Sequence, residues 1–103
     1  MSSKFGLKLE TIDSLNSIFA KYLQIERVIL YGSRAKGSFK PGSDIDLTIK
    51  APSFSVTELF MIEDEIDELL LPYKVDLSLL HQIENPDLLD HIQRVGIDFF
   101  KRS

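Results

Sequence analysis

The spacing of apolar residues predicts two long helices in the first seventy positions. Between residues 9 and 23 apolar side chains recur at steps of three and four, the pattern of an amphipathic helix with one side in a core. The same spacing predicts a second helix over residues 56–70, which Pro72 prevents from continuing. Ser55 and Glu58 have the spacing of a capping box, in which each side chain satisfies the backbone amide of the other. The expected buried stripes are Leu9, Ile12, Leu15, Ile18, Phe19, Tyr22 and Leu23 in the first helix, and Leu59, Phe60, Ile62, Glu63, Ile66, Leu69 and Leu70 in the second.

A third helix and four strands complete the pattern. The helix is expected after Asn85, because asparagine can cap a helix, Pro86 suits its first position and Gly96 closes it. Strands are predicted where β-branched and apolar residues run together or alternate with polar ones, over residues 27–31, 44–50, 74–80 and 97–101. In the second strand Ile45, Leu47 and Ile49 face a core, whereas Asp44, Asp46, Thr48 and Lys50 lie on a free face.

The order of these elements predicts the fold class. A helix is followed by two strands, then by a helix, a strand, a helix and a last strand, without internal repeats or a low-complexity linker. This order favours an α/β (α+β) fold, a small mixed β-sheet with helices packed on one side. A length of 103 residues allows one domain, residues 1–103.

Composition and charge narrow the class of function. The sequence has no cysteine, which excludes disulfides, thiolate zinc sites and thiol catalysis. It has neither a secretory signal pattern nor the roughly 20 consecutive apolar residues of a membrane span, so we expect a cytoplasmic protein without a membrane partner. A net charge of -4 argues against binding extended nucleic acid. Three basic residues, Arg34, Lys36 and Lys40, nevertheless form a local patch that suits one triphosphate.

Asp44 and Asp46 are candidate metal ligands because residues i and i+2 of one strand leave the same face. Two unpaired carboxylates about 4 Å apart repel by roughly 4 kcal/mol at an effective dielectric constant near 20, and a divalent cation removes that conflict. Oxygen ligands without imidazole or thiolate favour Mg²⁺. Asp76 stands at the same polar position of the third strand. If this strand pairs beside the second, its carboxylate completes a triad, and two Mg²⁺ ions can assist an in-line displacement. The simpler interpretation is that Asp76 is a surface residue.

Gly32 and Ser33 follow the first strand and can bind a triphosphate. A glycine permits close approach of the backbone, and a serine offers its hydroxyl and amide to phosphate oxygens. A Gly-Ser pair alone is most often a plain turn. The candidate nucleotide-binding set is Gly32, Ser33, Arg34, Lys36 and Ser43, and any of Arg34, Lys36 and Lys40 can neutralise phosphate charge. His81 and His91 lack the spacing of metal ligands, so we assign them no role and expect solvent-facing or structural histidines.

The stretch GSRAKGSFKPGSDIDLTIK resembles the polymerase-β-like nucleotidyltransferase superfamily, in which a Gly-Ser pair precedes Asp-x-Asp by ten residues. Over nearly the whole chain, including VDLSLL and ENPDLLDHI, the sequence is similar to the minimal bacterial branch (MNT). The resemblance implies triphosphate contacts at Gly32 and Ser33, metal ligands at Asp44 and Asp46, and a third catalytic acid at Asp76. It also implies transfer of AMP from ATP, and an antitoxin that adenylylates a tyrosine of a HEPN-type ribonuclease toxin encoded by a neighbouring gene.

Two other functions are left open by the sequence. The chain can be a non-catalytic module that neutralises its partner by contact, although the presence of all three acids speaks against this. It can also be an antibiotic-modifying nucleotidyltransferase, although such enzymes carry a second domain to hold their acceptor. The small size favours an acceptor that brings its own docking surface, which is a protein.

Overall fold

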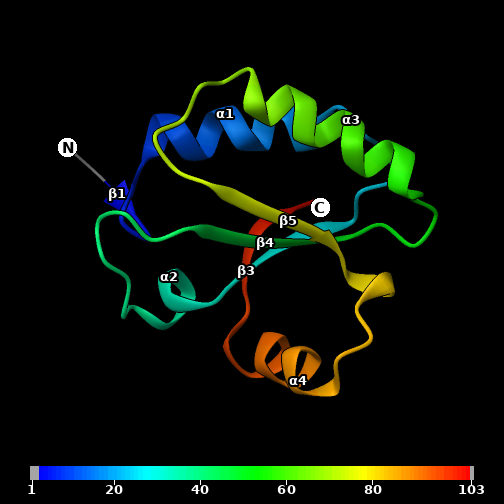
Figure 1. The fold of residues 1–103 in the computed structure, drawn as a ribbon. Helices are drawn as coiled ribbons and strands as arrows, with labels where there is room; N and C mark the ends of the chain where they lie inside the picture. The colour runs from blue at the N-terminus through cyan, green and yellow to red at the C-terminus, as the bar shows by residue number, and fades with distance from the viewer. Residues whose placement is uncertain (1–2, 103) are drawn as a thin grey trace.

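The computed structural model describes residues 3–102, and its centre is a four-stranded sheet (Figure 1). The elements are β1 (Ser3–Lys4), β2 (Leu7–Lys8), α1 (Leu9–Ala20), β3 (Arg27–Tyr31), α2 (Ser33–Lys36), β4 (Ile45–Lys50), α3 (Val56–Asp67), β5 (Val75–Leu79), a 3₁₀ turn η1 (Leu80–Gln82), α4 (Pro86–Val95) and β6 (Ile97–Lys101). The sheet order is β5-β4-β3-β6, with β3 antiparallel to β4 and β6, and β4 parallel to β5. The predicted fold class, a small mixed sheet with helices, is therefore confirmed.

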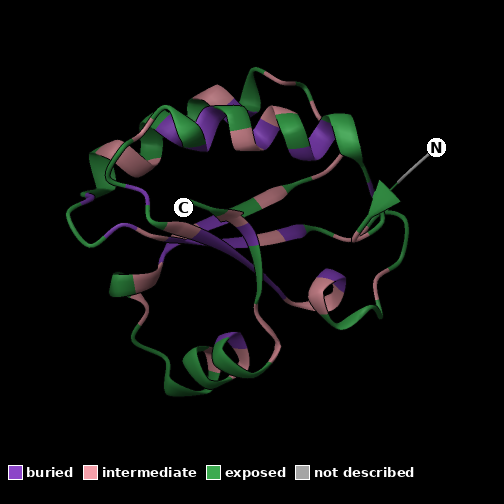
Figure 2. Ribbon diagram, turned by 180° about the vertical axis from the view of Figure 1, so that it is seen from behind, coloured by how far each residue is buried: buried purple, intermediate pink, exposed green. Residues whose placement is uncertain are grey.

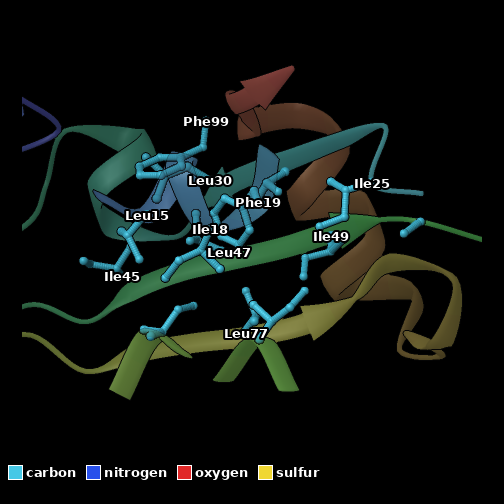
Figure 3. Close-up of a cluster of buried hydrophobic side chains, with 14 of the residues drawn as sticks. Leu15, Ile18, Phe19, Ile25, Leu30, Ile45, Leu47, Ile49, Leu77 and Phe99 are labelled. Carbon is cyan, nitrogen blue, oxygen red and sulfur yellow. The ribbon is translucent and has the colours of Figure 1, made fainter. Parts of the chain in front are cut away.

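The helices lie on both faces of the sheet, not on one as expected. Helices α1 and α3 cover the face that holds the main core (Figures 1 and 3), whereas α4 packs on the opposite face. There Ile92 of α4 contacts Ile29 and Tyr31 of β3, which alternate with the core residues of that strand. The chief residues of the main core are Leu15, Ile18, Phe19, Val28, Leu30, Ile45, Leu47, Ile49, Ile62 and Leu77. The colouring by burial in Figure 2 shows purple along the sheet and along the inward side of the helices.

The second face of β4 is accordingly not free along its whole length. Thr48 is fully buried, and its Oγ1 accepts a hydrogen bond of 3.0 Å from Ser78 of β5. Alternation of polar and apolar residues correctly predicted which side chains share a face, but a hydroxyl can be buried when it has a partner. The start of this face, around Asp46, stays accessible to a ligand, because Asp46 is half-buried and Asp44 is exposed.

Both long helices end earlier than their apolar spacing predicts. α1 ends at Ala20 and Leu23 is 80% exposed, while α3 ends at Asp67 and Leu70 is 87% exposed. Leu9 and Phe60, expected in the stripes, are exposed as well. Past each end the backbone makes tighter turns, in which Tyr22 donates to the Phe19 carbonyl and Leu70, with a positive φ of 53°, donates to the Asp67 carbonyl. The spacing continues into these turns although the helix does not.

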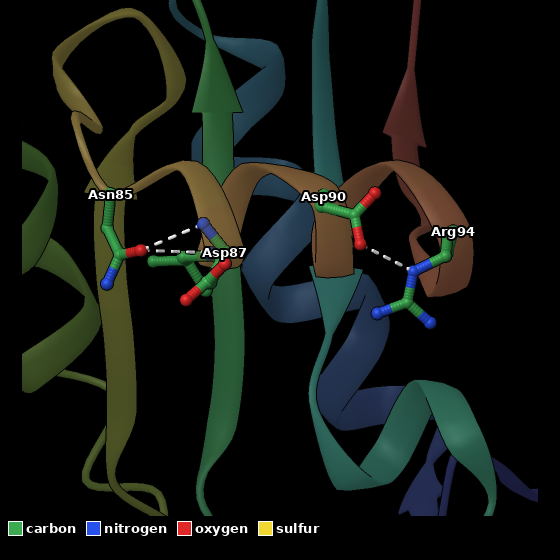
Figure 4. Close-up of polar contacts among 5 residues, drawn as sticks. Asn85, Asp87, Asp90 and Arg94 are labelled. Carbon is green, nitrogen blue, oxygen red and sulfur yellow. Dashed lines mark hydrogen bonds and ion pairs between the residues drawn. The ribbon is translucent and has the colours of Figure 1, made fainter.

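The two predicted helix starts differ in how they are capped. Ser55 donates its hydroxyl hydrogen to Glu58 at 2.6 Å, so the side chains bind each other and not the backbone amides, contrary to the capping-box prediction. At α4 the prediction is confirmed, because Asn85 Oδ1 accepts from the amides of Asp87 and Leu88 at 2.9 and 3.3 Å (Figure 4). Pro86 follows as the first helical residue. Helix α4 thus begins at a fixed point below the sheet.

A short hairpin that the sequence did not predict precedes α1. Strands β1 and β2 pair antiparallel around Phe5 and Gly6, both with positive φ. Its strands have two residues each, too few to leave a pattern of alternation. Among the described residues no helix is long and apolar enough to cross a membrane.

Candidate active site

The sheet brings three acidic residues together at one end. Asp46 on β4 is the register partner of Tyr31 on β3 and of Asp76 on β5. The condition for a triad, that the strand carrying Asp76 pairs beside the strand carrying Asp46, is therefore met. Asp44 is exposed and lies two residues earlier, just outside β4, where the prediction had placed it inside the strand.

Asp46 is the acid most affected by its surroundings. Burial raises the pKa of its carboxyl, and the negative charges of Asp76 and Asp44 raise it further. The positive charge of Arg34, and that of His91 whenever its imidazole is protonated, act in the opposite direction but do not outweigh these effects. A folded protein that keeps this carboxyl ionised at neutral pH therefore does so at a cost in stability, which a bound cation would offset.

The donor set suits a hard divalent cation. The three side chains offer oxygen ligands only, and these are the ligands that Mg²⁺ prefers. Within residues 3–102 no three acidic or histidine side chains are gathered closely enough to form a metal cluster unaided. Mg²⁺ commonly takes one or two protein carboxylates and completes its shell with substrate phosphates and water. The residues present fit that arrangement, in which the substrate supplies part of the coordination.

Gly32 allows the backbone to lie directly against Asp46. Its φ of 76° and ψ of -156° fall in a region that is essentially restricted to glycine. A Cβ atom at this position would also clash with Oδ2 of Asp46. Two independent constraints therefore require glycine here, and the close approach predicted from the Gly-Ser pair is directed at the carboxylate. Ser33 follows at once as the half-buried first residue of α2.

Arg34 has a structural position that the sequence did not predict. The residue is only 2% exposed, and its guanidinium lies over the rings of Phe39 and Tyr73, 5.2 and 5.0 Å from their centroids. It donates to the carbonyl oxygens of Phe5 (2.8 Å) and Ser43 (2.7 and 3.2 Å). A guanidinium occupied in this way ties the hairpin β1-β2 to the loop that carries Asp44. These carbonyl acceptors favour a structural role for Arg34, and its predicted contact with phosphate stays a prediction.

The remaining candidates lie at the end of α2 and on the loop between α2 and β4. Lys36 is exposed in α2, and Lys40 is exposed in the loop. Ser43 is half-buried, and its Oγ accepts a hydrogen bond of 2.9 Å from the Lys40 amide. The hydroxyl of Ser43 thus shapes the loop just before Asp44. Of the predicted basic residues, Lys36 and Lys40 are the ones whose side chains are free of burial.

His91, to which the sequence pattern assigned no role, lies beside the site. The ring of His91 on α4 meets Tyr31 edge-on, with centroids 6.1 Å apart, and its Nε2 accepts a hydrogen bond of 3.1 Å from the Gly32 amide. His91 was expected to have no role because histidine spacing was judged against metal ligands. The available signal was the position of Tyr31 on the same face as Ile29, which points to a helix covering that face.

Solved structures resemble this fold at low sequence identity. A chain of a toxin–antitoxin complex crystallised with AMP-PNP matches with a TM-score of 0.70 and 19% identity, over 94% of this chain and 76% of that one. A chain of the MntA-HepT toxin–antitoxin complex matches with a TM-score of 0.66 and 14% identity, over 92% and 74%. A chain of the complex between the tri-AMPylated HEPN toxin of Shewanella oneidensis and its MNT antitoxin matches with a TM-score of 0.66 and 14% identity, over 91% and 72%.

Comparison at the level of sequence assigns the family. No curated protein matches the sequence. The profile of the family described as "Polymerase beta, Nucleotidyltransferase" matches residues 13–103, a stretch that includes the Gly32 turn and all three acids. The chain therefore belongs to the polymerase beta nucleotidyltransferase family.

Proposed function

We propose that the chain transfers AMP from ATP to a hydroxyl group of a partner protein and releases pyrophosphate. The observation that carries this proposal is the row Tyr31, Asp46 and Asp76 on three neighbouring strands, with Gly32 packed against Asp46. A triphosphate bound at the turn and cations bound at the acids would share this end of the sheet. Solved structures of similar fold contain AMP-PNP in one case and an AMPylated toxin in another, which supports the same donor.

The donor nucleotide is held on the side of β3 and α2. Ser33 offers its hydroxyl and amide to phosphate oxygens. Gly32 has no side chain, so the triphosphate can approach the backbone closely. Lys36 at the end of α2 and Lys40 on the following loop are both exposed, and these cations neutralise phosphate charge. Arg34 and the hydroxyl of Ser43 act indirectly, by fixing the loop that leads to Asp44.

The acids divide the chemical work. Asp44, Asp46 and Asp76 would hold Mg²⁺, which when bound stabilises negative charge on the attacking and leaving oxygens. Asp76 lies on the edge strand and accepts the proton of the incoming hydroxyl. The hydroxyl oxygen then forms its bond to the α-phosphorus while the bond from that phosphorus to pyrophosphate breaks. The products are an AMP ester and pyrophosphate.

The acceptor is a HEPN-type toxin encoded by a neighbouring gene, modified on a tyrosine, and the chain is its antitoxin. Two observations support a protein acceptor. A net charge of -4 disfavours extended nucleic acid as the acceptor. The solved complexes of similar fold pair their chain with a toxin, in one case an AMPylated HEPN toxin.

The experiment is a transfer assay with the protein encoded beside this chain. Purified chain, that partner, Mg²⁺ and ATP labelled at the α-phosphate are incubated, and label on the partner is followed by gel and mass spectrometry. We expect label on tyrosine, lost in Asp44→Asn and Asp46→Asn. Asp13→Asn, an exposed acid on α1 away from the acids of the site, is the matched control and should transfer at the rate of the unchanged chain.

Two outcomes would replace this proposal. If no label appears, yet the unchanged chain and Asp44→Ala protect cells from the partner equally well, the chain is a binding module that acts by contact. If an aminoglycoside or another small hydroxylated drug is labelled and the partner is not, the chain is an antibiotic-modifying nucleotidyltransferase.

A further inference from the structure

The imidazole of His91 contacts the turn that begins the nucleotide site, although 59 residues separate it from Gly32. Its Nε2 accepts a hydrogen bond of 3.1 Å from the Gly32 amide, and its ring packs edge-on against Tyr31 at an interplanar angle of 81°. We propose that His91 is a positioning residue, which holds the Gly32 turn in the conformation that binds Mg-ATP. This inference rests on the proposed function for its link to catalysis, but its structural part can be tested separately.

The Gly32 amide needs a partner from outside the sheet. In β3 the register with β4 ends at Tyr31, so the ladder supplies no acceptor for the following amide. A backbone amide near the interior that has no acceptor costs free energy comparable to a lost hydrogen bond. His91 is half-buried and supplies that acceptor. The unusual backbone angles of Gly32 are therefore held from the far face of the sheet.

Helix α4 brings the ring to this point because its own position is fixed. Its start is fixed by the side chain of Asn85, and Ile92 packs between it and β3. At its end a Cβ on Gly96 would lie 2.7 Å from Cγ2 of Ile29, so glycine allows the helix to approach the strand closely. His91 precedes Ile92 and is thus placed by residues that have no contact with nucleotide.

The hydrogen bond also determines the state of the imidazole. An accepting Nε2 carries no hydrogen, so in this hydrogen bond the imidazole holds its hydrogen on Nδ1. A glutamine side chain can present its Oε1 near the position of Nε2, whereas leucine has similar bulk and no acceptor. Comparing His91→Gln with His91→Leu therefore distinguishes the effect of the hydrogen bond from the effect of side-chain packing.

A loosened Gly32 turn would weaken binding of the donor nucleotide and leave binding of the acceptor protein unchanged. The backbone of Gly32 lies so close to Asp46 that a Cβ would clash with its Oδ2, and Ser33 follows directly. Movement of the turn therefore displaces the phosphate-binding serine relative to a metal-binding acid. The expected result is weaker Mg-ATP binding with an unchanged KM for the acceptor protein.

The test uses the full chain as His91→Leu and His91→Gln. His81→Leu is the matched control, because His81 lies in η1, is exposed and is far from the Gly32 turn. We expect a through-hydrogen-bond scalar coupling between the Gly32 and His91 nitrogens in NMR spectra of the unchanged chain. His91→Leu should increase the exchange rate of the Gly32 amide and the Kd and KM for Mg-ATP by about two- to tenfold, the range of one net hydrogen bond. His91→Gln should restore most of each loss, and His81→Leu should change none of them.

Three results would overturn the proposal. One is a proton on Nε2 of His91 in the unchanged chain, and another is a His91→Leu variant with Gly32 exchange and Mg-ATP affinity at their original values. The third is a His91→Leu variant that only melts earlier and binds Mg-ATP normally, which means that His91 serves packing alone. If His91→Leu does not fold, the scalar coupling and the His91→Gln variant still decide. Amide hydrogen exchange at Gly32 and the affinity for Mg-ATP can be measured without the protein that accepts AMP. Absence of AMP transfer would therefore contradict the proposed function and leave these results intact.

Discussion

Replacing Asp46 by asparagine should stabilise the protein when no metal is present. The substitution keeps the shape of the side chain and removes one of three negative charges. Asp46 is the register partner of Asp76 on the neighbouring parallel strand, and Asp44 stands two residues before it. Since adjacent strands lie about 4.8 Å apart, the two partner carboxylates are separated by roughly 5 Å.

The size of the effect follows from this separation. Two charges about 5 Å apart interact by roughly 3 kcal/mol at an effective dielectric constant of 20 and by under about 1 kcal/mol in water. Asp46 is half-buried and Asp76 is exposed, so solvent screening places the repulsion between these limits. We expect a gain of about 1–2 kcal/mol for Asp46→Asn in the absence of metal. For a chain of this size about 1 kcal/mol corresponds to about 4–8 °C in Tm.

The gain should depend on pH in a defined direction. Burial, then the charges of Asp76 and Asp44, raise the pKa of Asp46 in the folded state above its unfolded value of about 3.9. The folded state therefore binds this proton more tightly than the unfolded state, and the resulting stability is complete below the unfolded pKa and lost as pH rises through the raised pKa. The advantage of asparagine is thus largest near neutral pH and shrinks as pH falls towards about 4.

Thermal melts followed by circular dichroism in EDTA, from pH 7.5 down to 4.5, measure this advantage, with Asp13→Asn as the control for removal of an exposed acid. In Mg-ATP the order should reverse, because ligand at a hundredfold excess over Kd stabilises the unchanged chain by about 2.7 kcal/mol and the variant by much less. A variant that melts at or below the temperature of the unchanged chain in EDTA at pH 7.5, or a gain that does not change with pH, would refute the reasoning.

Three further substitutions test the turn, the buried arginine and the helix that carries His91. Gly32→Ala should destabilise the fold by about 1–3 kcal/mol and abolish the Mg-ATP shift in Tm, because alanine is unfavourable at these backbone angles and its Cβ would clash with the Asp46 carboxylate. Gly42→Ala, at a position with open space around it, should have neither effect. Arg34→Lys should lower the free energy of unfolding in urea by about 2–3 kcal/mol, since an ammonium cannot satisfy both carbonyl oxygens from between two aromatic rings; unchanged stability would mean that the guanidinium is not held as described. Asn85→Ala should cost about 1 kcal/mol through the lost cap of α4, and a gain in stability would contradict that assignment.

Most of the fold could be predicted from periodicity and from residues with a local effect. The alternation in β4 and the run in β3 identified both central strands, and Asn85 with Pro86 located the start of α4. The ends of α1 and α3 could not be located, because Leu23 and Leu70 continue the apolar spacing after the backbone has left the helix. The face on which α4 packs depends on contacts between residues far apart in sequence, and periodicity carries no information about them.

The candidate site divides in the same way. Spacing along one strand placed Asp44 and Asp46 together, and the polar pattern of β5 suggested Asp76, whose proximity then depended on strand order. The position of Arg34 could not be predicted from the sequence. A guanidinium beside a Gly-Ser turn has the composition of a phosphate site, and in the structure this guanidinium donates to the carbonyl oxygens of Phe5 and Ser43.

The sheet order gives the proposed reaction a direction of approach. Strands β3, β4 and β5 lie side by side, so the Gly32 turn stands on one flank of Asp46 and Asp76 stands on the other. β5 is an edge strand and Asp76 is exposed, whereas the flank of β3 is covered by α4 through His91 and Ile92. A triphosphate fixed at the turn therefore leaves the edge beside β5 as the open route for a hydroxyl, and the acid proposed to accept its proton is the one that borders this route. A partner protein that docks along β5 can bring its acceptor hydroxyl to the α-phosphorus without displacing the donor nucleotide.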